Sequence, residues 1–339
     1  MPAVQIEAPA KLNMCLLVGD RRPDGFHGIE SLFLALPFGD TLRFETVPAS
    51  QTPAGQAEAD EIHMKWEETP RDGDDYGLNN NFTSFNDLQL WKKIPSPQEN
   101  IILRAVSMYK NRTGYNRRLK ITVEKRIPLG GGLGGGSSDA AATLLALNRL
   151  ASIEDEFFSN DTVLAGIGAE LGSDVSFFLG QESAAAWVSG RGEIVTPVTM
   201  PQSFFGLSLV LVNPGFHSDT AGAYRLLDEY RLTHPSRHPQ NEILLRSFAG
   251  PACEWRLHND FLSVFLASGK DGAVYQTILD SLRDLGADCA GLSGSGSTCF
   301  GVFSSPEESA QAGMALSECW PFVKNIFPLD KQAGLRYTY

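Results

Sequence analysis

A short glycine-rich segment in the middle of the chain constrains the fold most strongly. Six glycines fall between positions 130 and 136, and Ser137, Ser138 and Asp139 follow them directly. The next stretch, 140–150, is rich in alanine and leucine and predicts a helix. Glycines let several backbone N–H groups converge on one point, and the N-terminus of the helix adds further unpaired N–H groups. This combination predicts an anion-binding loop suited to a phosphate group.

The loop also contains the spacing G-x-G-x-x-G, as Gly130, Gly132 and Gly135, so a dinucleotide-binding fold is one alternative. Such folds place the first glycine directly after a parallel strand and an acidic residue about 20 positions later. Here residues 125–128 separate the expected strand from the glycines, and the next acidic residues, 154–156, precede a helix. The Walker loop and the protein-kinase loop are excluded, because their Gly-Lys-[Ser/Thr], His-Arg-Asp and Asp-Phe-Gly signatures do not occur. A purely structural turn stays open as the second alternative.

Charge and cysteine content exclude several classes of protein. The 339 residues carry 28 Lys and Arg against 40 Asp and Glu, a net charge of −12. This balance argues against nucleic acid as a partner, because phosphate neutralisation needs an excess of positive charge. The five cysteines are scattered without a C-x-x-C pair, so we expect neither a disulfide framework nor a zinc site. With no apolar run of about 20 residues and no secretory leader, we expect a cytoplasmic protein without a membrane partner.

Strand and helix signals alternate irregularly along the chain, which favours an α+β fold over a doubly wound parallel sheet. The segments that predict regular structure are strands at 4–6, 12–18, 41–47, 119–123 and 206–212, hairpin-like pairs at 184–198 and 290–302, and helices at 100–111, 140–150, 162–171, 221–229, 259–267, 274–285 and 307–319. Residues 8–10, Ala-Pro-Ala, indicate a break between the first two strands. Residues 48–98 show no sustained period and predict a surface insertion.

Five motifs in a fixed order carry a resemblance to a known family. The central motif is Pro128-Leu129-Gly130-Gly131-Gly132-Leu133-Gly134-Gly135-Gly136-Ser137-Ser138. The other four are Ala8-Pro9-Ala10-Lys11-Leu12-Asn13, Arg22-Pro23-Asp24-Gly25-Phe26-His27, Leu171-Gly172-Ser173-Asp174-Val175 and Leu292-Ser293-Gly294-Ser295-Gly296-Ser297. Together they resemble the GHMP small-molecule kinases, in which the central motif is the ATP loop. The resemblance covers most of the chain outside residues 48–98.

The resemblance implies a two-domain α+β fold. Residues 1–200 would form an N-terminal domain similar to the second domain of ribosomal protein S5, with 48–98 as its surface insertion. Residues 201–339 would form a ferredoxin-like C-terminal domain. ATP and an alcohol substrate would meet in the cleft between the two domains, with ATP bound by every residue of the central motif.

Lys11 and Asp174 match the catalytic positions of the family. The resemblance implies that Asp174 accepts the proton of the acceptor hydroxyl, while Lys11 keeps Asp174 ionised and polarises the reacting groups. Taken alone, Asp174 would be interpreted as a helix N-cap and Lys11 as a solvated lysine. Mg²⁺ is expected together with ATP, and the sequence offers only Ser138 and Asp174 as candidate ligands.

Two of the motifs, 22–27 and 171–175, are similar to members that phosphorylate the 2-hydroxyl of a cytidine diphosphate-linked polyol in isoprenoid biosynthesis. This resemblance implies that Asn13 binds a hydroxyl of the polyol and that His27 hydrogen-bonds the cytosine edge. Phe26 stands where the family usually has tyrosine, and its ring would stack on the base.

Four further positions have weaker signals. Tyr224 is the candidate for the opposite stacking wall, with a helix core aromatic as the alternative. Gly294 and Gly296 would allow close backbone approach to the substrate. Lys125, just before the ATP loop, matches a family position near the adenosine, with a surface strand-end lysine as the alternative.

Two other functions stay open at this point. One is a GHMP kinase for another small alcohol, of the homoserine or mevalonate type. The motif at 22–27 argues against it, because an acceptor without a base has no use for a stacking aromatic. The other, less favoured, is a dinucleotide-dependent oxidoreductase.

Overall fold

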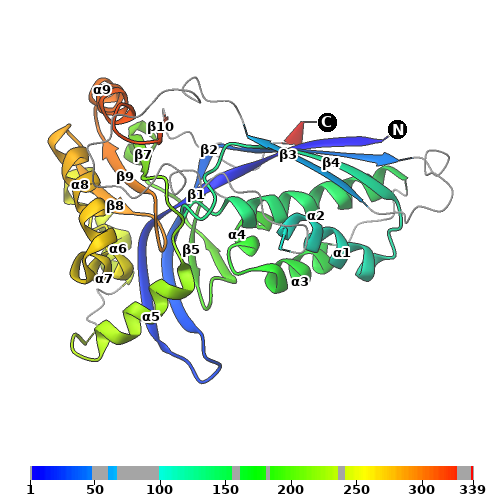
Figure 1. The fold of residues 1–339 in the computed structure, drawn as a ribbon, viewed down its shortest axis with the longest axis horizontal. Helices are drawn as coiled ribbons and strands as arrows, with labels where there is room; N and C mark the ends of the chain where they lie inside the picture. Colours follow the sequence, from blue (N-terminus) through cyan, green and yellow to red (C-terminus); the bar gives the residue numbers. More distant parts are fainter. Residues whose placement is uncertain are drawn as a thin grey trace.

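Two β-sheets with helices packed on them organise the protein (Figure 1). The computed structural model describes residues 2–47, 60–66, 99–154, 161–180, 184–235, 241–326 and 337–338. Most of the predicted insertion, 48–59 and 67–98, therefore lies outside the described residues. Within these described ranges, no helix has the length and apolar character that crossing a bilayer requires.

Two long antiparallel strands, β1 (Ala3–Arg21) and β2 (His27–Val47), form the centre of the first sheet. The order across this sheet is β11-β1-β2-β4-β3, and β5 and β6 extend it beside β2. The bounds of these further strands are Glu61–Trp66 (β3), Arg118–Lys125 (β4), Ala185–Ser189 (β5), Ile194–Pro197 (β6) and Tyr337–Thr338 (β11). Because β1 and β2 are so long, they reach from the first sheet to the second half of the molecule (Figure 1).

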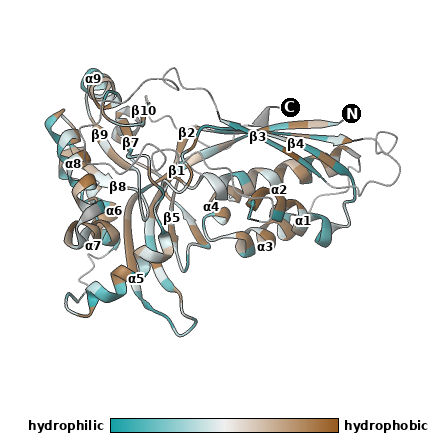
Figure 2. Cartoon of the chain, viewed as in Figure 1, coloured by the Kyte–Doolittle hydropathy of each residue, from teal (hydrophilic) through white to brown (hydrophobic). Residues whose placement is uncertain are grey.

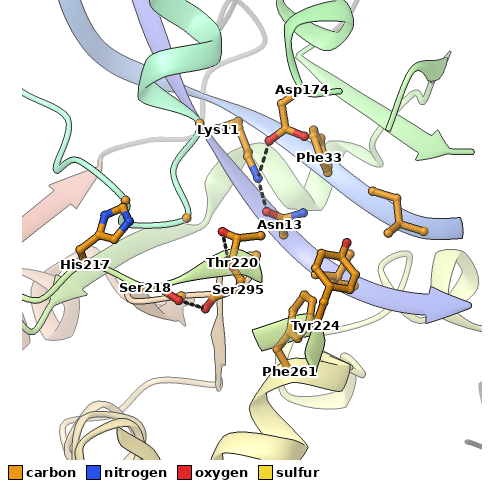
Figure 3. Close-up of a pocket in the computed structure, with 17 residues that line it drawn as sticks. Lys11, Asn13, Phe33, Asp174, His217, Ser218, Thr220, Tyr224, Phe261 and Ser295 are labelled. Atoms are coloured by element: carbon orange, nitrogen blue, oxygen red, sulfur yellow. Dashed lines mark hydrogen bonds and ion pairs between the residues drawn. The ribbon is translucent and has the colours of Figure 1, made fainter. Parts of the chain in front are cut away.

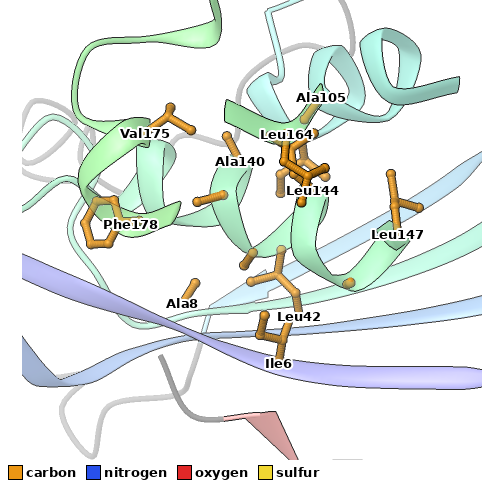
Figure 4. Close-up of a cluster of buried hydrophobic side chains, with 14 of the residues drawn as sticks. Ile6, Ala8, Leu42, Ala105, Ala140, Leu144, Leu147, Leu164, Val175 and Phe178 are labelled. Carbon is orange, nitrogen blue, oxygen red and sulfur yellow. The ribbon is translucent and has the colours of Figure 1, made fainter. Parts of the chain in front are cut away.

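Four helices cover one face of the first sheet. They are α1 (Ile101–Thr113), α2 (Gly135–Glu154), α3 (Asp161–Leu171) and α4 (Val175–Leu179). Leu144 and Leu147 of α2 pack with Ile6 and Leu42 of the sheet, and all four side chains are fully buried (Figure 4). Each buried side chain of this size contributes about 1.5–3 kcal/mol. The fully buried run 140–142 consists of alanines, which lets α2 lie close to β1.

The second sheet has the strand order β10-β7-β9-β8 and is antiparallel throughout. Its strands are Ser208–Asn213 (β7), Cys289–Leu292 (β8), Cys299–Phe303 (β9) and Phe322–Ile326 (β10). Between β7 and β8 come α5 (Thr220–Arg231), α6 (Asn241–Ser247), α7 (Asp260–Ser268) and α8 (Lys270–Asp284), and α9 (Pro306–Ser317) precedes β10. A β-α-β-β-α-β order of this kind is ferredoxin-like, which confirms that prediction.

A shared apolar core joins the two sheets. Leu12 and Met14 of β1 are buried together with Leu209 and Leu211 of β7 and with Phe300 of β9. Hydrophobic colouring accordingly follows β1 between the two halves, whereas the tip of the β1–β2 hairpin is hydrophilic (Figure 2). The sheets are thus fixed against each other by burial of apolar surface.

Four features differ from the sequence-based expectation. β1 runs unbroken through 8–10, because the proline sits at a register shift between Pro9 and Lys11 that accommodates its missing N–H group. Residues 61–66, expected in an irregular insertion, form β3 and pair in parallel with β4. The helix after the glycines begins at Gly135, five residues earlier than predicted. β11, near the end of the expected C-terminal domain, pairs with β1 in the first sheet.

Candidate active site

A cavity of about 200 Å³ lies where the two halves meet (Figure 3). Lys11 and Asn13 project into it from β1, and Asp174 enters from the start of α4. The glycine-rich loop and the turn at 294–296 form much of the remaining wall. The structure therefore brings together the residues that the sequence predicted to be catalytic.

Lys11 and Asp174 form an ion pair inside this cavity. Lys11 Nζ lies 3.4 Å from Asp174 Oδ2, and the two side chains are 4 % and 28 % exposed. Lys11 Nζ also donates to Asn13 Oδ1 and lies 4.4 Å from the centroid of the Phe33 ring. Asp174 precedes α4 without accepting a capping hydrogen bond, so its carboxylate is directed to Lys11 instead of the helix. Asp174 thus stands at the N-cap position of α4 without capping the helix, and the solvated-lysine interpretation of Lys11 is wrong.

Asn13 is held by hydrogen bonds from both halves of the protein. Its Nδ2 donates to Ser31 Oγ at 2.8 Å, and its backbone N–H donates to Ser293 Oγ at 3.1 Å. The residue is 2 % exposed, and its Oδ1 faces Lys11. The side chain is thus fixed beside the ion pair.

The glycine-rich loop has the backbone conformation that its sequence predicts. Gly130, Gly132 and Gly134 have φ values of 63°, 76° and 70°, which other residues rarely adopt. A Cβ on Gly132 would lie 2.2 Å from the Ser293 carbonyl oxygen, so this position also requires glycine for space. Lys11 N–H donates to the Leu133 carbonyl at 2.9 Å and ties the loop to β1.

Several predicted loop residues support the loop instead of facing the cavity. Leu133 is 1 % exposed and packs in the shared core, and Ser138 is fully buried. The Ser138 hydroxyl has no hydrogen-bond partner within the described part of the chain. Gly294 and Gly296 do line the cavity, and Asn259 Nδ2 holds this turn by donating to the Leu292 and Gly294 carbonyls at 2.8 and 2.9 Å.

Lys125 is buried beneath the glycine-rich loop, so the alternative of a surface strand-end lysine is wrong. It is 1 % exposed, and its ammonium group bonds to Asp40 and, at 2.6 Å, to Asp139 Oδ2. Asp40 also accepts the backbone N–H groups of Arg126 and Ile127, at 2.5 and 2.9 Å. These bonds join the end of β4 to the first turn of α2. Lys125 therefore links the segments on both sides of the glycine-rich loop, and its ammonium group is paired with two carboxyl groups.

Burial and neighbouring charge shift the protonation of this cluster. Burial alone would lower the pKa of Lys125, but the attraction of Asp139 and Asp40 outweighs it and raises the pKa. Burial raises the pKa of Asp139 to about 8, although Lys125 opposes the rise, and the nearby Asp40 adds to it. Two buried carboxyl groups thus share one ammonium group, and one of them keeps its proton at neutral pH.

A second cavity, of about 480 Å³, adjoins the first and shares Asp174 and Tyr224 with it. Its lining includes Phe26, which is 55 % exposed, and His27. The guanidinium carbon of Arg191 lies 5.2 Å from the centroid of the Phe26 ring, in cation–π contact. Arg191, between Gly190 and Gly192 in the β5–β6 turn, is a wall residue that the sequence analysis missed.

His27 and Tyr224 are arranged differently from the expectation. Their rings stack on each other with centroids 5.1 Å apart, so Tyr224 packs against His27 while it lines the same cavity as Phe26. His27 Nδ1 donates to the Gly19 carbonyl at 2.9 Å, and Nε2 lies 3.3 Å from Asp228 Oδ1. With its side chain 6 % exposed, His27 has both ring nitrogens engaged within the protein.

Other residues of the site carried no recognisable sequence signal. Ser31 and Ser293 position Asn13, and Thr220 Oγ1 lies 2.9 Å from Ser295 Oγ in the wall of the cavity. Single serines and threonines of this kind are common on surfaces. Of these residues, only Ser293 and Ser295 could have been predicted from the sequence, because they lie inside the C-terminal motif.

A glycine-rich loop beside a lysine–aspartate ion pair fits a phosphotransferase for small molecules. Two family models match the chain, the N-terminal domain of GHMP kinases over residues 100–181 and the C-terminal domain of GHMP kinases over residues 258–321. The chain belongs to the GHMP kinase family.

Within this family, the chain is similar to proteins named 4-diphosphocytidyl-2-C-methyl-D-erythritol kinase. The relative from Anaeromyxobacter sp. (strain Fw109-5) is 36 % identical over 321 residues, which cover 93 % of this chain and 87 % of that protein. The relative from Treponema pallidum (strain Nichols) is 32 % identical over 94 % of this chain and 97 % of that protein. A crystal structure of 4-(cytidine 5'-diphospho)-2C-methyl-D-erythritol kinase superposes with a TM-score of 0.68 at 28 % identity, covering 95 % of this chain and 98 % of that chain.

Proposed function

We propose that this protein transfers the γ-phosphate of ATP to the 2-hydroxyl of 4-diphosphocytidyl-2-C-methyl-D-erythritol, in the non-mevalonate route to isoprenoid precursors. The observation that carries the proposal is the Lys11–Asp174 pair, which lies between the glycine-rich loop and the cavity lined by Phe26. The names of the relatives support the choice of acceptor. Nothing in the site favours the oxidoreductase alternative over this one.

Asp174 is the base in this proposal. Phosphoryl transfer to an alcohol depends on alignment, on neutralisation of charge, and on removal of one proton. The 28 % exposed Asp174 carboxylate lies at the junction of the two cavities, where an acceptor hydroxyl would sit. The Lys11 ammonium group, 3.4 Å from Asp174 Oδ2, would hold this carboxylate in place while it accepts the proton.

Lys11 has a second task toward the transferred phosphoryl group. Its ammonium group is held by Asp174, Asn13 and the Phe33 ring, so it needs little reorganisation when charge develops. The glycine-rich loop would bind the phosphates of ATP through backbone N–H groups and the N-terminus of α2. This explains how an acidic chain binds a polyanion without a basic surface.

Mg²⁺ fits the site as a partner of the nucleotide. Within the described residues, no group of three or more His, Cys, Asp or Glu could hold a metal ion alone. Mg²⁺ commonly takes one or two protein oxygens together with substrate phosphates. The Asp174 carboxylate lines the cavity and would be the protein ligand, whereas the fully buried Ser138 hydroxyl does not face the cavity. When bound, Mg²⁺ would neutralise phosphate charge.

The larger cavity would hold the cytidine. Phe26 offers an exposed ring on which the base stacks, and Arg191 lies over the same ring as a second planar group. Because both His27 nitrogens are engaged, we propose that His27 orients the pocket and that its backbone meets the cytosine edge. Tyr224 lines both cavities and would separate the cytosine from the site of phosphoryl transfer.

A coupled assay of ADP release tests the acceptor. Purified protein would be given ATP and Mg²⁺ with 4-diphosphocytidyl-2-C-methyl-D-erythritol, mevalonate, homoserine or galactose, each at the same concentration. We expect turnover with the cytidine compound at least a hundredfold above that with the others. Turnover confined to one of the three other alcohols would overturn the proposed acceptor while leaving the kinase activity in place.

A further inference from the structure

One imidazole in the first cavity has no role in the mechanism so far. His217 lies in the segment between β7 and α5 and lines the 200 Å³ cavity together with Gly130, Gly132 and Gly134 (Figure 3). Its ring lies against the first glycine of the loop, since a Cβ built on Gly130 would be 1.6 Å from His217 Nδ1. The imidazole thus occupies the space that the missing side chain of Gly130 leaves free.

The backbone on both sides of His217 is anchored to the site. Ser218 N–H donates to the Gly130 carbonyl at 3.2 Å, and Ser218 Oγ donates to the Ser295 carbonyl at 2.5 Å. On the other side, Ser297 Oγ donates to the Phe216 carbonyl at 2.6 Å. The His217 ring itself is exposed and has no hydrogen-bond or ion-pair partner among the described residues. A fixed backbone therefore presents a free N–H donor beside a phosphate-binding loop.

Lys11 and His217 stand at opposite ends of the loop. A Cβ on Gly134 would lie 2.8 Å from Lys11 Cγ, whereas His217 meets Gly130. Lys11 is paired with Asp174, so its end of the loop is the end where transfer occurs. His217 lines only the first cavity and is absent from the lining of the cavity that holds Phe26. Its place is with the nucleotide phosphates that are not transferred.

We propose that His217 is a phosphate-contacting residue, whose imidazole N–H donates to an oxygen of the ATP phosphates that remain in ADP. The inference rests on ATP as the phosphoryl donor of the proposed function. A hydrogen bond to a charged phosphate changes affinity by about ten- to a hundredfold. Because these phosphates remain in ADP, His217 would act on nucleotide affinity and leave the chemical step nearly unchanged.

Calorimetric titration of the full chain with ADP, and separately with CDP, tests this role. Three variants divide the contributions of the side chain: His217→Phe keeps a ring over Gly130 without a donor, His217→Asn keeps an N–H donor, and His217→Ala removes both. His63→Ala is the matched control, because His63 is an exposed histidine (64 %) on the edge strand β3 of the other sheet.

We expect the ADP Kd to rise about tenfold or more in His217→Phe and His217→Ala, with most of the affinity restored in His217→Asn. The CDP Kd and the kcat at saturating ATP should stay within twofold of the original protein, as should all values for His63→Ala. Unchanged ADP affinity in His217→Phe would overturn the inference, and so would a loss confined to CDP. If the original protein does not bind ADP, ATP as the donor fails, and the proposed function fails with it.

Discussion

The buried cluster beneath the glycine-rich loop gives a prediction with a large effect. Substitution of Lys125 by methionine removes the only ammonium group among the described residues that contacts Asp40 and Asp139. The two carboxylate side chains are 0 % and 4 % exposed, so water cannot replace the lost partner. Methionine has a similar length and fills the space, so the effect measured is the loss of charge and hydrogen bonds.

The expected cost is about 3–5 kcal/mol in the free energy of unfolding, the range for removing one partner of a buried ion pair. A domain typically has about 5–15 kcal/mol in total. The cost has an upper limit because Asp139, whose pKa burial raises to about 8, already holds its proton at neutral pH, so only one carboxylate loses its counterion. Asp40 keeps the N–H groups of Arg126 and Ile127 and stays partly satisfied.

Urea unfolding followed by tryptophan fluorescence measures this cost, and ADP titration measures its effect on the loop. Asp139→Asn is the matched control, because an amide resembles the protonated carboxyl group. We expect this control to match the original protein at about pH 4, where the carboxyl group is protonated in both the folded and the unfolded chain, and to be at least as stable at neutral pH. For Lys125→Met we expect weaker ADP binding as well, since the cluster joins β4 to the first turn of α2. A Lys125→Met stability within about 1 kcal/mol of the original would refute the reasoning.

The remaining predictions concern pH, the base and the stacking ring. Because the pKa of Asp139 is raised to about 8, the folded protein keeps a proton that the unfolded chain releases, so Asp139 stabilises the folded protein below about pH 4 and this contribution is lost as the pH rises toward about 8. Asp139→Asn should therefore gain stability relative to the original protein between these pH values. An equal pH dependence of urea unfolding in the two proteins would contradict this. Asp174→Asn should lower kcat by about a hundredfold or more with little change in the ATP KM, and an unchanged kcat would exclude Asp174 as the base. Phe26→Ala should raise the KM for the cytidine substrate by the equivalent of about 1–3 kcal/mol, whereas an unaltered KM would exclude stacking there.

The local motifs of the site were predictable from the sequence because their chemistry depends on neighbouring residues. The glycines at 130, 132 and 134 have the left-handed backbone that an anion-binding loop needs. The ferredoxin-like strand order followed from the family resemblance and is confirmed. The pairing of Lys11 with Asp174, 163 positions apart in the chain, followed from the resemblance alone, since no local pattern joins them.

What could not be predicted depends on contacts between distant segments. Asp40 stands in a Gly-Asp-Thr sequence that is typical of an exposed turn, yet it is fully buried against Lys125 from another strand. Tyr224 lies in the same cavity as Phe26, but its stacking on the His27 ring had no signal in the sequence. Arg191 in a glycine turn has the sequence of a surface loop, and only the fold places it over Phe26. Burial and partner choice are tertiary properties that the sequence pattern does not encode locally.

The most direct test of the central claim is to identify the product. The protein would be incubated with ATP, Mg²⁺ and 4-diphosphocytidyl-2-C-methyl-D-erythritol, and the product analysed by mass spectrometry and phosphorus NMR. We expect one added phosphate, located on the 2-oxygen of the methylerythritol, with formation slowed about a hundredfold or more in Asp174→Asn. A phosphate on another oxygen, or an equal rate in Asp174→Asn, would contradict the account.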